Sequence, residues 1–328
     1  MLRAIAHKPY RVRNGEASRS KLSVPDPRPW VADHSTQKQW SFAAANCYLL
    51  WAFTPPALYH PLIAAPFPKR MRRLSDRRTP ANRSAVMAAS SVTDVLIRRL
   101  ETIVKLPQDE RDALATLPFM TREIGAGHDV FREHDSPIQC CLILEGHAFR
   151  YKMLDEGKRQ ILSFHIAGDI PDLQSLHLDV MDHGLMTLCA SKAAFIPHKV
   201  LRPFLHAHPR IADAFWRDTL VDAAIFREWV ANVGRRTAFG RLAHLLCESF
   251  TRMKSVGLAE AQSFDMPVTQ EQLGDATGLS AVHVNRTLTD LRDQGLVELS
   301  RHRVIVKDWQ GLQDAAGFDP AYLHLQGG

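Results

Sequence analysis

Residues 269–306 constrain the fold more than any other part of this chain. Thr269 precedes a short amphipathic run, and a glutamine stands three residues later, which is the spacing of a helix capping box. Gly278 then interrupts the helical pattern at a position suited to a sharp turn. Ser280 is placed to cap a second helix, and Gly295 is placed to end it. The pattern predicts two short helices joined by a tight turn.

Two short β-type runs follow at 296–299 and 303–306, with a turn at 300–302 between them. Two helices, a turn and a β-hairpin in this order form a winged helix-turn-helix, whose second helix enters the DNA major groove. An ordinary helical hairpin that touches no nucleic acid is the alternative. Because the caps, the turn and the wing fall in the right order, the sequence favours DNA binding.

One face of the second predicted helix should be buried, because Val284, Leu288 and Leu291 recur at helical spacing. The opposite face is then free to contact DNA, together with the caps and the wing. Arginine suits guanine, valine suits the thymine methyl group, and asparagine suits adenine or phosphate. The predicted DNA-binding residues are Thr269, Ser280, Val282, His283, Asn285, Arg286, Thr289, Arg301 and Arg303.

The charge is distributed unevenly along the 328 residues, which suffice for two domains. Residues 1–86 hold 15 Lys and Arg against 4 acidic residues, whereas residues 87–328 hold 26 against 31. The high pI therefore comes from the N-terminal extension. Any attraction of the remaining chain for DNA must come from a local basic patch.

Residues 1–86 are rich in Pro and Arg and show no sustained hydrophobic period. We expect this extension to be disordered or absent from a native protein that starts at Met87. Residues 39–68 carry no charged side chain, but prolines cut this stretch below the roughly 20 residues that a membrane helix needs. The five cysteines show no CxxC spacing, and there is no convincing signal peptide. A cytoplasmic location with no membrane contact is expected.

Residues 122–199 alternate short β-type runs with Gly and Asp turns, which predicts a small sandwich or barrel. Pro209 then opens a long helix that is apolar on more than one face. Such a helix must be buried on more than one face, so we expect it to pack on its own β domain and on a second copy. A monomeric core helix is the alternative. The predicted dimerisation residues are Phe215, Phe226, Trp229 and Val233.

The stretches LILEGHAFRYK, ILSFHIAGD, FIPHKVL and GLSAVHVNRTLTDL, in this order, resemble the Crp–Fnr superfamily of bacterial transcription regulators. The resemblance covers roughly residues 118–306. It implies an α+β fold with an N-terminal β-roll of the cyclic-nucleotide-binding type, a long dimerisation helix and a C-terminal winged helix-turn-helix. It also implies a homodimer on a two-fold DNA site, with RNA polymerase as a further partner, and makes Arg286 the match of the family's base-reading arginine.

The sequence departs from the family at the effector site. Cyclic-AMP binders carry an arginine that neutralises the phosphate, but the matching stretch, 168–184, holds no Arg or Lys and contains Asp172, Asp179 and Asp182. Residues 87–139 hold no cysteine, whereas the family's oxygen sensors use an N-terminal cysteine cluster for iron–sulfur binding. We therefore expect neither a cyclic nucleotide nor an iron–sulfur cluster, and leave a small-molecule or redox effector open.

The expected domains are a basic extension (1–86), a helix with the β-roll sensor (87–208), the dimerisation helix and hinge (209–234), the DNA-binding domain (235–308) and a C-terminal tail (309–328). No hydrolase, P-loop or zinc-protease motif is present, so no enzyme and no catalytic residue are predicted. No metal site is predicted, although several histidines leave one as a minor alternative. A sensor protein with weak or accessory DNA binding, and a constitutive DNA binder with an empty β-roll, also remain open.

Overall fold

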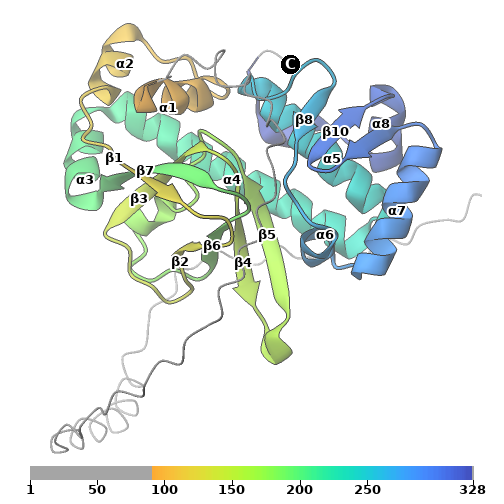
Figure 1. Ribbon diagram of the computed structural model, residues 1–328. Helices are drawn as coiled ribbons and strands as arrows, with labels where there is room; N and C mark the ends of the chain where they lie inside the picture. The colour runs from red at the N-terminus through yellow and green to blue at the C-terminus, as the bar shows by residue number, and fades with distance from the viewer. Residues whose placement is uncertain (1–90, 327–328) are drawn as a thin grey trace, which may run out of the picture. The chain divides into compact units, whose positions relative to one another are not determined.

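The computed structural model describes residues 91–326, all within one compact unit. Two helices precede a β domain, which leads into a long helix and a C-terminal helical domain with a small sheet (Figure 1). The β domain and the helices around it comprise α1 (Val92–Glu101), α2 (Gln108–Leu114), β1 (Met120–Ile124), β2 (Asp129–Phe131), β3 (Gln139–Glu145), β4 (Ala148–Met153), η1 (Asp155–Gly157), β5 (Arg159–His165), η2 (Leu173–Leu176), β6 (Gly184–Thr187), β7 (Ser191–Pro197) and α3 (His198–Ala207). The rest comprises α4 (Pro209–Arg235), α5 (Ala238–Ser255), β8 (Ser263–Asp265), α6 (Gln270–Thr277), α7 (Ala281–Asp293), β9 (Val297–Ser300), β10 (Arg303–Val306), α8 (Trp309–Ala316) and η3 (Pro320–Leu323).

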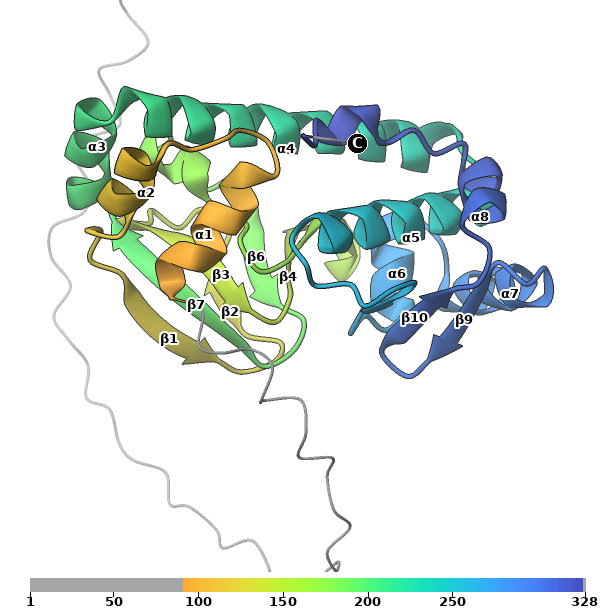
Figure 2. The same cartoon turned by 90° about the horizontal axis from the view of Figure 1, so that it is seen from above.

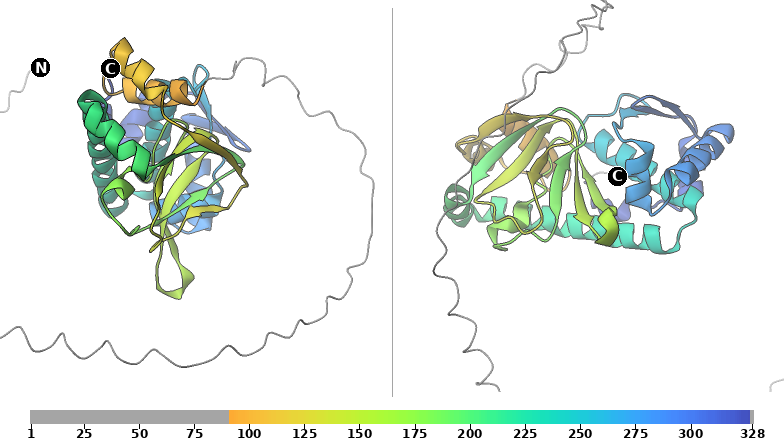
Figure 3. Two further views of the ribbon diagram at one scale, coloured as in Figure 1. Left: turned by 90° about the vertical axis from the view of Figure 1, so that its left-hand side faces the viewer. Right: turned by 60° about the horizontal axis from the view of Figure 1, so that its bottom comes forward.

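The β domain consists of two antiparallel sheets, with strand orders β1-β7-β3 and β2-β6-β4-β5. Apolar residues of β3 and β7 meet those of β2, β4 and β6 in one buried cluster, so the two sheets face each other. The β4–β5 hairpin extends beyond the rest of its sheet (Figure 3). This arrangement confirms the predicted β-roll and the α+β fold.

Strand β3 is buried on both of its faces. Cys141 belongs to the cluster between the two sheets, whereas the adjacent Cys140 belongs to a second cluster formed with α1, α2, α3 and α4. Successive side chains of a strand point to opposite faces, and here both faces are covered. Both thiols are therefore fully buried, and burial raises the pKa of each.

Helix α4 runs from the β-roll to the C-terminal domain (Figure 2). Val221, Ile225 and Trp229 on α4 join a third apolar cluster that contains Phe149 and Phe164 of the β-roll. The same cluster contains buried side chains of α5, α6, α7 and the third sheet, β8-β10-β9. One continuous apolar core therefore extends from the β-roll into the helix-turn-helix.

Within the predicted C-terminal tail, the described residues 309–326 pack against the preceding helices. Leu312 of α8 is fully buried against α5, and Leu323 of η3 lies in the same core. The Tyr322 hydroxyl donates a hydrogen bond of 2.8 Å to Glu248 Oε2 on α5. The domain boundary expected at residue 308 is wrong, because residues 309–323 bury apolar surface that the preceding helices cannot cover alone.

Three expectations fall on residues that the structure does not describe, which include residues 1–90. They concern the basic extension, the alternative start at Met87 and the uncharged stretch 39–68. Within residues 91–326, no helix combines the length and the hydropathy that a membrane span requires.

Candidate nucleic-acid interface

The helix-turn-helix has the local geometry that its sequence predicts. Thr269 Oγ1 accepts a hydrogen bond from the Gln272 amide at 3.1 Å, and Gln272 Oε1 accepts one from the Thr269 amide at 2.8 Å. Gly278 ends α6 with φ of +69°, a left-handed conformation that favours glycine. Ser280 Oγ then caps α7 by accepting a hydrogen bond from the His283 amide at 3.3 Å. The turn angle between the two helices is thus fixed by backbone and caps.

Helix α7 presents one polar face to solvent. Its inward face comprises Val284, Thr287, Leu288 and Leu291, which are buried. On its outward face Val282 is 82% exposed, and His283, Asn285 and Arg286 are exposed as well. An exposed valine is available to contact a thymine methyl group.

Two of the predicted DNA-binding side chains on α7 have partners within the domain. Asn285 Nδ2 donates to Gln270 Oε1 at the start of α6, at 3.2 Å. Thr289 is half-buried, and its hydroxyl accepts a hydrogen bond of 2.9 Å from Arg292 Nη2. Asn285 therefore braces the two helices, and Thr289 orients a neighbouring arginine.

The three predicted arginines differ in whether their guanidinium groups are paired with carboxylates. Within residues 91–326, Arg286 on α7 and Arg301 in the wing turn form no ion pair, and both are exposed. Arg303 is half-buried, and its Nη2 lies 2.7 Å from Glu260 Oε2 and 2.5 Å from Ser263 Oγ. The charge of Arg303 is thus partly neutralised beside β8, so Arg286 and Arg301 are the stronger candidates for contacts with DNA.

Helix α4 places the four predicted dimerisation residues on different sides. Phe215 and Trp229 are buried within their own chain. The Trp229 indole donates to Glu248 Oε1 at 3.0 Å, and its ring packs edge-on against Phe164 with centroids 5.7 Å apart. Phe226 is about half exposed and Val233 is half-buried. Of the four, Phe226 and Val233 alone are accessible to a second copy in the described part of the chain.

An apolar stripe on the exposed side of α4 contains one predicted dimerisation residue, Phe226, and three residues that the prediction did not include. Trp216 is 62% exposed and Val230 is 59% exposed, and Leu220 and Phe226 are each 49% exposed. Their spacing places these side chains opposite the buried face of the helix. Because α4 is apolar almost all round, its sequence could not show which apolar side covers the β-roll. We call these four residues, Trp216, Leu220, Phe226 and Val230, the α4 stripe.

A buried ionic network joins the β-roll to α1, α4 and α5. Asp169, in the loop after β5, contacts Arg99 Nε at 3.0 Å, Arg252 Nη2 at 2.7 Å and His165 Nδ1 at 3.3 Å. Arg99 Nη2 also lies 2.7 Å from Asp218 on α4. Removing one partner from a buried network leaves uncompensated charge, so the network strongly favours this relative placement of the elements.

The protonation of this region follows from its burial. Burial alone would raise the pKa of Asp169, but Arg252, His165 and Arg99 hold it well below its usual range. Burial lowers the pKa of His165 to about 4. Asp172 accepts a hydrogen bond from the Cys141 amide at 2.8 Å, and burial raises its pKa to about 7. Among residues 91–326, no three His, Cys, Asp or Glu side chains converge in a way that could hold a metal ion.

Comparisons with known proteins agree with this geometry. The family described as a Crp-like helix-turn-helix domain matches residues 240–315. The transcriptional activator protein FnrL of Cereibacter sphaeroides is 26% identical over 233 residues, which covers 69% of this chain and 92% of that protein. The nitrogen fixation regulation protein FixK of Bradyrhizobium diazoefficiens is 27% identical over 179 residues, covering 53% of this chain and 73% of that protein.

Among solved structures, FixK2 from Bradyrhizobium japonicum superposes with a TM-score of 0.56 at 22% identity, covering 61% of this chain and 98% of that one. This likeness supports the fold. The match to the Crp-like domain coincides with the helix-turn-helix described above, and the named relatives are transcription regulators. The chain is therefore a DNA-binding transcription regulator with a Crp-like helix-turn-helix domain, and it is similar to regulators of the Crp–Fnr type.

Proposed function

We propose that this regulator acts in the cytoplasm as a homodimer that reads a two-fold DNA site through Arg286, Val282 and neighbouring residues of α7. The observation that carries this proposal is the exposed polar face of α7, on which Arg286 has no ion pair within residues 91–326. A guanidinium free of protein partners is able to donate two hydrogen bonds to guanine O6 and N7.

The α4 stripe supports the homodimer. Four large apolar side chains remain exposed along one side of a 27-residue helix. A two-fold axis beside this helix would bury each stripe against its copy, and would place two recognition helices on one face of a duplex. The proposed dimer contact is therefore the α4 stripe. Of the residues first predicted, it includes Phe226 but not the buried Phe215 and Trp229.

We further propose that the signal is not a cyclic nucleotide. The space between the β-roll and α4, lined by Arg150, His165, Asp169 and Asp222 among others, measures only about 20 Å³. Ligand sites for small molecules usually measure about 300–1,000 Å³. Arg150 Nη1 is also engaged by Asp222 Oδ2 at 2.5 Å, so this arginine is not free to neutralise a phosphate.

Selection of bound sequences from random duplex DNA by the full chain tests the proposal. We expect enrichment of an inverted repeat whose half-sites lie about one helical turn apart. The Arg286→Ala variant, selected in parallel, should lose preference at one base pair in each half-site. Enrichment of a single half-site would contradict the two-fold complex, and no enrichment by either protein would favour a sensor with accessory DNA binding.

A further inference from the structure

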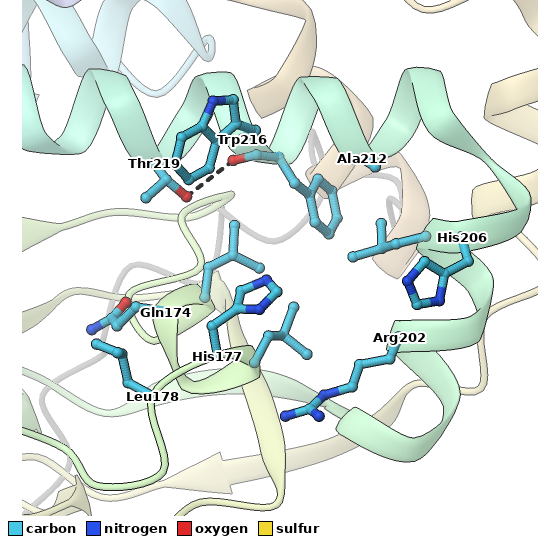
Figure 4. Close-up of a pocket in the computed structure, with 12 residues that line it drawn as sticks. Gln174, His177, Leu178, Arg202, His206, Ala212, Trp216 and Thr219 are labelled. Carbon is cyan, nitrogen blue, oxygen red and sulfur yellow. Dashed lines mark hydrogen bonds between the residues drawn. The ribbon is translucent and has the colours of Figure 1, made fainter. Parts of the chain in front are cut away.

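A pocket of about 610 Å³ opens on the surface between η2, α3 and α4 (Figure 4). Its volume lies within the range of small-molecule sites. It adjoins the 20 Å³ space under α4, with which it shares Leu173, Gln174 and Thr219, but it alone is lined by α3. The elements around it are fixed, since α3 and α4 share the apolar cluster that covers β3 and β7.

The walls of the pocket are mainly apolar. Leu173, Leu176, Leu205 and Phe215 contribute to its lining, and Trp216 stands at its edge on α4. The Thr219 hydroxyl in the lining already donates to the Phe215 carbonyl at 3.1 Å. An apolar cavity of this size favours a ligand with a hydrocarbon or aromatic body.

Arg202 supplies the one guanidinium in the pocket lining. It forms no ion pair with any carboxylate within residues 91–326. Figure 4 shows this side chain reaching from α3 across the pocket toward His177 and Leu178. No Asp or Glu lines the pocket, so nothing in its wall would repel an anion.

We propose that this pocket binds an organic anion with an apolar body, whose acidic group pairs with Arg202. A guanidinium prefers a carboxylate, sulfonate or similar planar or multi-oxygen group, and the apolar walls would cover the rest of the molecule. The proposal names the chemical class of the signal. It therefore rests on the proposed function as a signal-controlled regulator.

The pocket is placed to influence the dimer. Trp216 lines the pocket and is also the first residue of the α4 stripe. A ligand that contacts the indole would fix its orientation, and hence the apolar surface that α4 offers to a second copy. Such a ligand acts only through its different affinities for the two arrangements.

Fluorescence titration of the full chain with 8-anilinonaphthalene-1-sulfonate, and with its uncharged analogue N-phenyl-1-naphthylamine, tests the site. We expect Arg202→Gln to weaken binding of the sulfonate roughly tenfold, because the charge pair is lost. Binding of the uncharged analogue should stay within about twofold, because the apolar walls are intact. Arg217→Gln is the matched control, since Arg217 is exposed on α4 and does not line the pocket.

Equal affinity of the sulfonate for the native chain and Arg202→Gln would overturn the proposal, as would an equal loss in Arg217→Gln. The proposal would also be overturned if a monomeric variant bound the sulfonate and the native chain did not. A second copy would then occupy the pocket in the native protein. The titration contains no DNA, so failure of the DNA-site proposal leaves its result unchanged.

Discussion

Arg159 on β5 and Asp275 on α6 form an ion pair in which Asp275 Oδ2 lies 2.9 Å from Nε and 2.8 Å from Nη2 of the arginine. The next residue of the strand, Gln160, donates from Nε2 to the Asp275 carbonyl at 2.8 Å. Two successive side chains of the β-roll therefore hold the first helix of the helix-turn-helix. This contact joins the β-roll to the DNA-binding domain and involves none of the residues of the buried ionic network.

We predict that Arg159→Gln loosens α6 while leaving global stability nearly unchanged. Both side chains of the pair are about one quarter exposed, and such pairs contribute about 1 kcal/mol or less. Hydrogen–deuterium exchange of peptides from α6 should be faster in the variant. Lys158→Gln is the control, because Lys158 pairs with Glu156 in the exposed hairpin tip. Unchanged exchange in α6 would show that the apolar core alone holds the helix.

The buried Asp172 should make stability depend on pH. Its pKa is raised to about 7 by burial, whereas an unfolded Asp titrates near 3.9. Between these values the folded state binds more protons, so stability falls as pH rises from about 4 to 7, by up to about 1.4 kcal/mol per pH unit. The stabilising contribution of the protonated form is complete below the unfolded pKa.

Urea unfolding of the native chain and of Asp172→Asn, measured between pH 4.5 and 7.5, tests this assignment. The asparagine keeps an oxygen for the Cys141 amide but cannot ionise. The stability of the variant relative to the native chain should therefore increase with pH. Other groups, His165 included, titrate in both proteins and cancel in the difference. Parallel curves would contradict the raised pKa.

The recognition arginine should contribute both affinity and sequence preference. We predict that Arg286→Ala weakens binding to the selected site by about 1–3 kcal/mol and relaxes preference at one base pair of each half-site. Competition gel shifts with single-base variants of the site would measure this. Arg292→Ala serves as control, since Arg292 on the same helix is held by Thr289. A uniform loss over all sequences would instead assign Arg286 to phosphate contact.

The α4 stripe should determine the oligomeric state. Val230→Arg would place like charges opposite each other across a two-fold axis, so we expect dissociation to monomers in sedimentation velocity. The fold should survive, because Val230 is 59% exposed in its own chain. Arg217→Glu changes an exposed residue of α4 outside the stripe and should leave the dimer intact. A dimer that persists in Val230→Arg would place the interface on another surface.

The local parts of the DNA-binding domain were predictable because their signals lie within a few residues of one another. The capping box at Thr269, the left-handed Gly278 and the wing strands β9 and β10 are set by caps and turns. Gly274 shows the limit of such reasoning. A Cβ there would clash with the Leu279 carbonyl oxygen, a close approach that only the folded turn reveals.

The parts that sequence reasoning missed depend on contacts between distant residues. In the buried network Asp169 pairs with Arg252, which lies 83 positions away, so no local spacing indicates the network. The sequence alone left Arg303 available for DNA. Its partner Glu260 lies just before β8, a strand that no sequence pattern indicated. The two sides of α4 are similarly apolar, and the fold alone assigns one to the core.

Helix α4 continues without a break for 27 residues, from Pro209 to Arg235. At 1.5 Å per residue the helix is about 40 Å long, so a small tilt at one end becomes a larger displacement at the other. A tilt of about 5° at the end beside η2 and the α3–α4 pocket would displace the other end, next to α5, by about 3.5 Å. That distance is close to the rise of one DNA base pair, so a small change beside Trp216 would suffice to move a recognition helix out of register with its half-site.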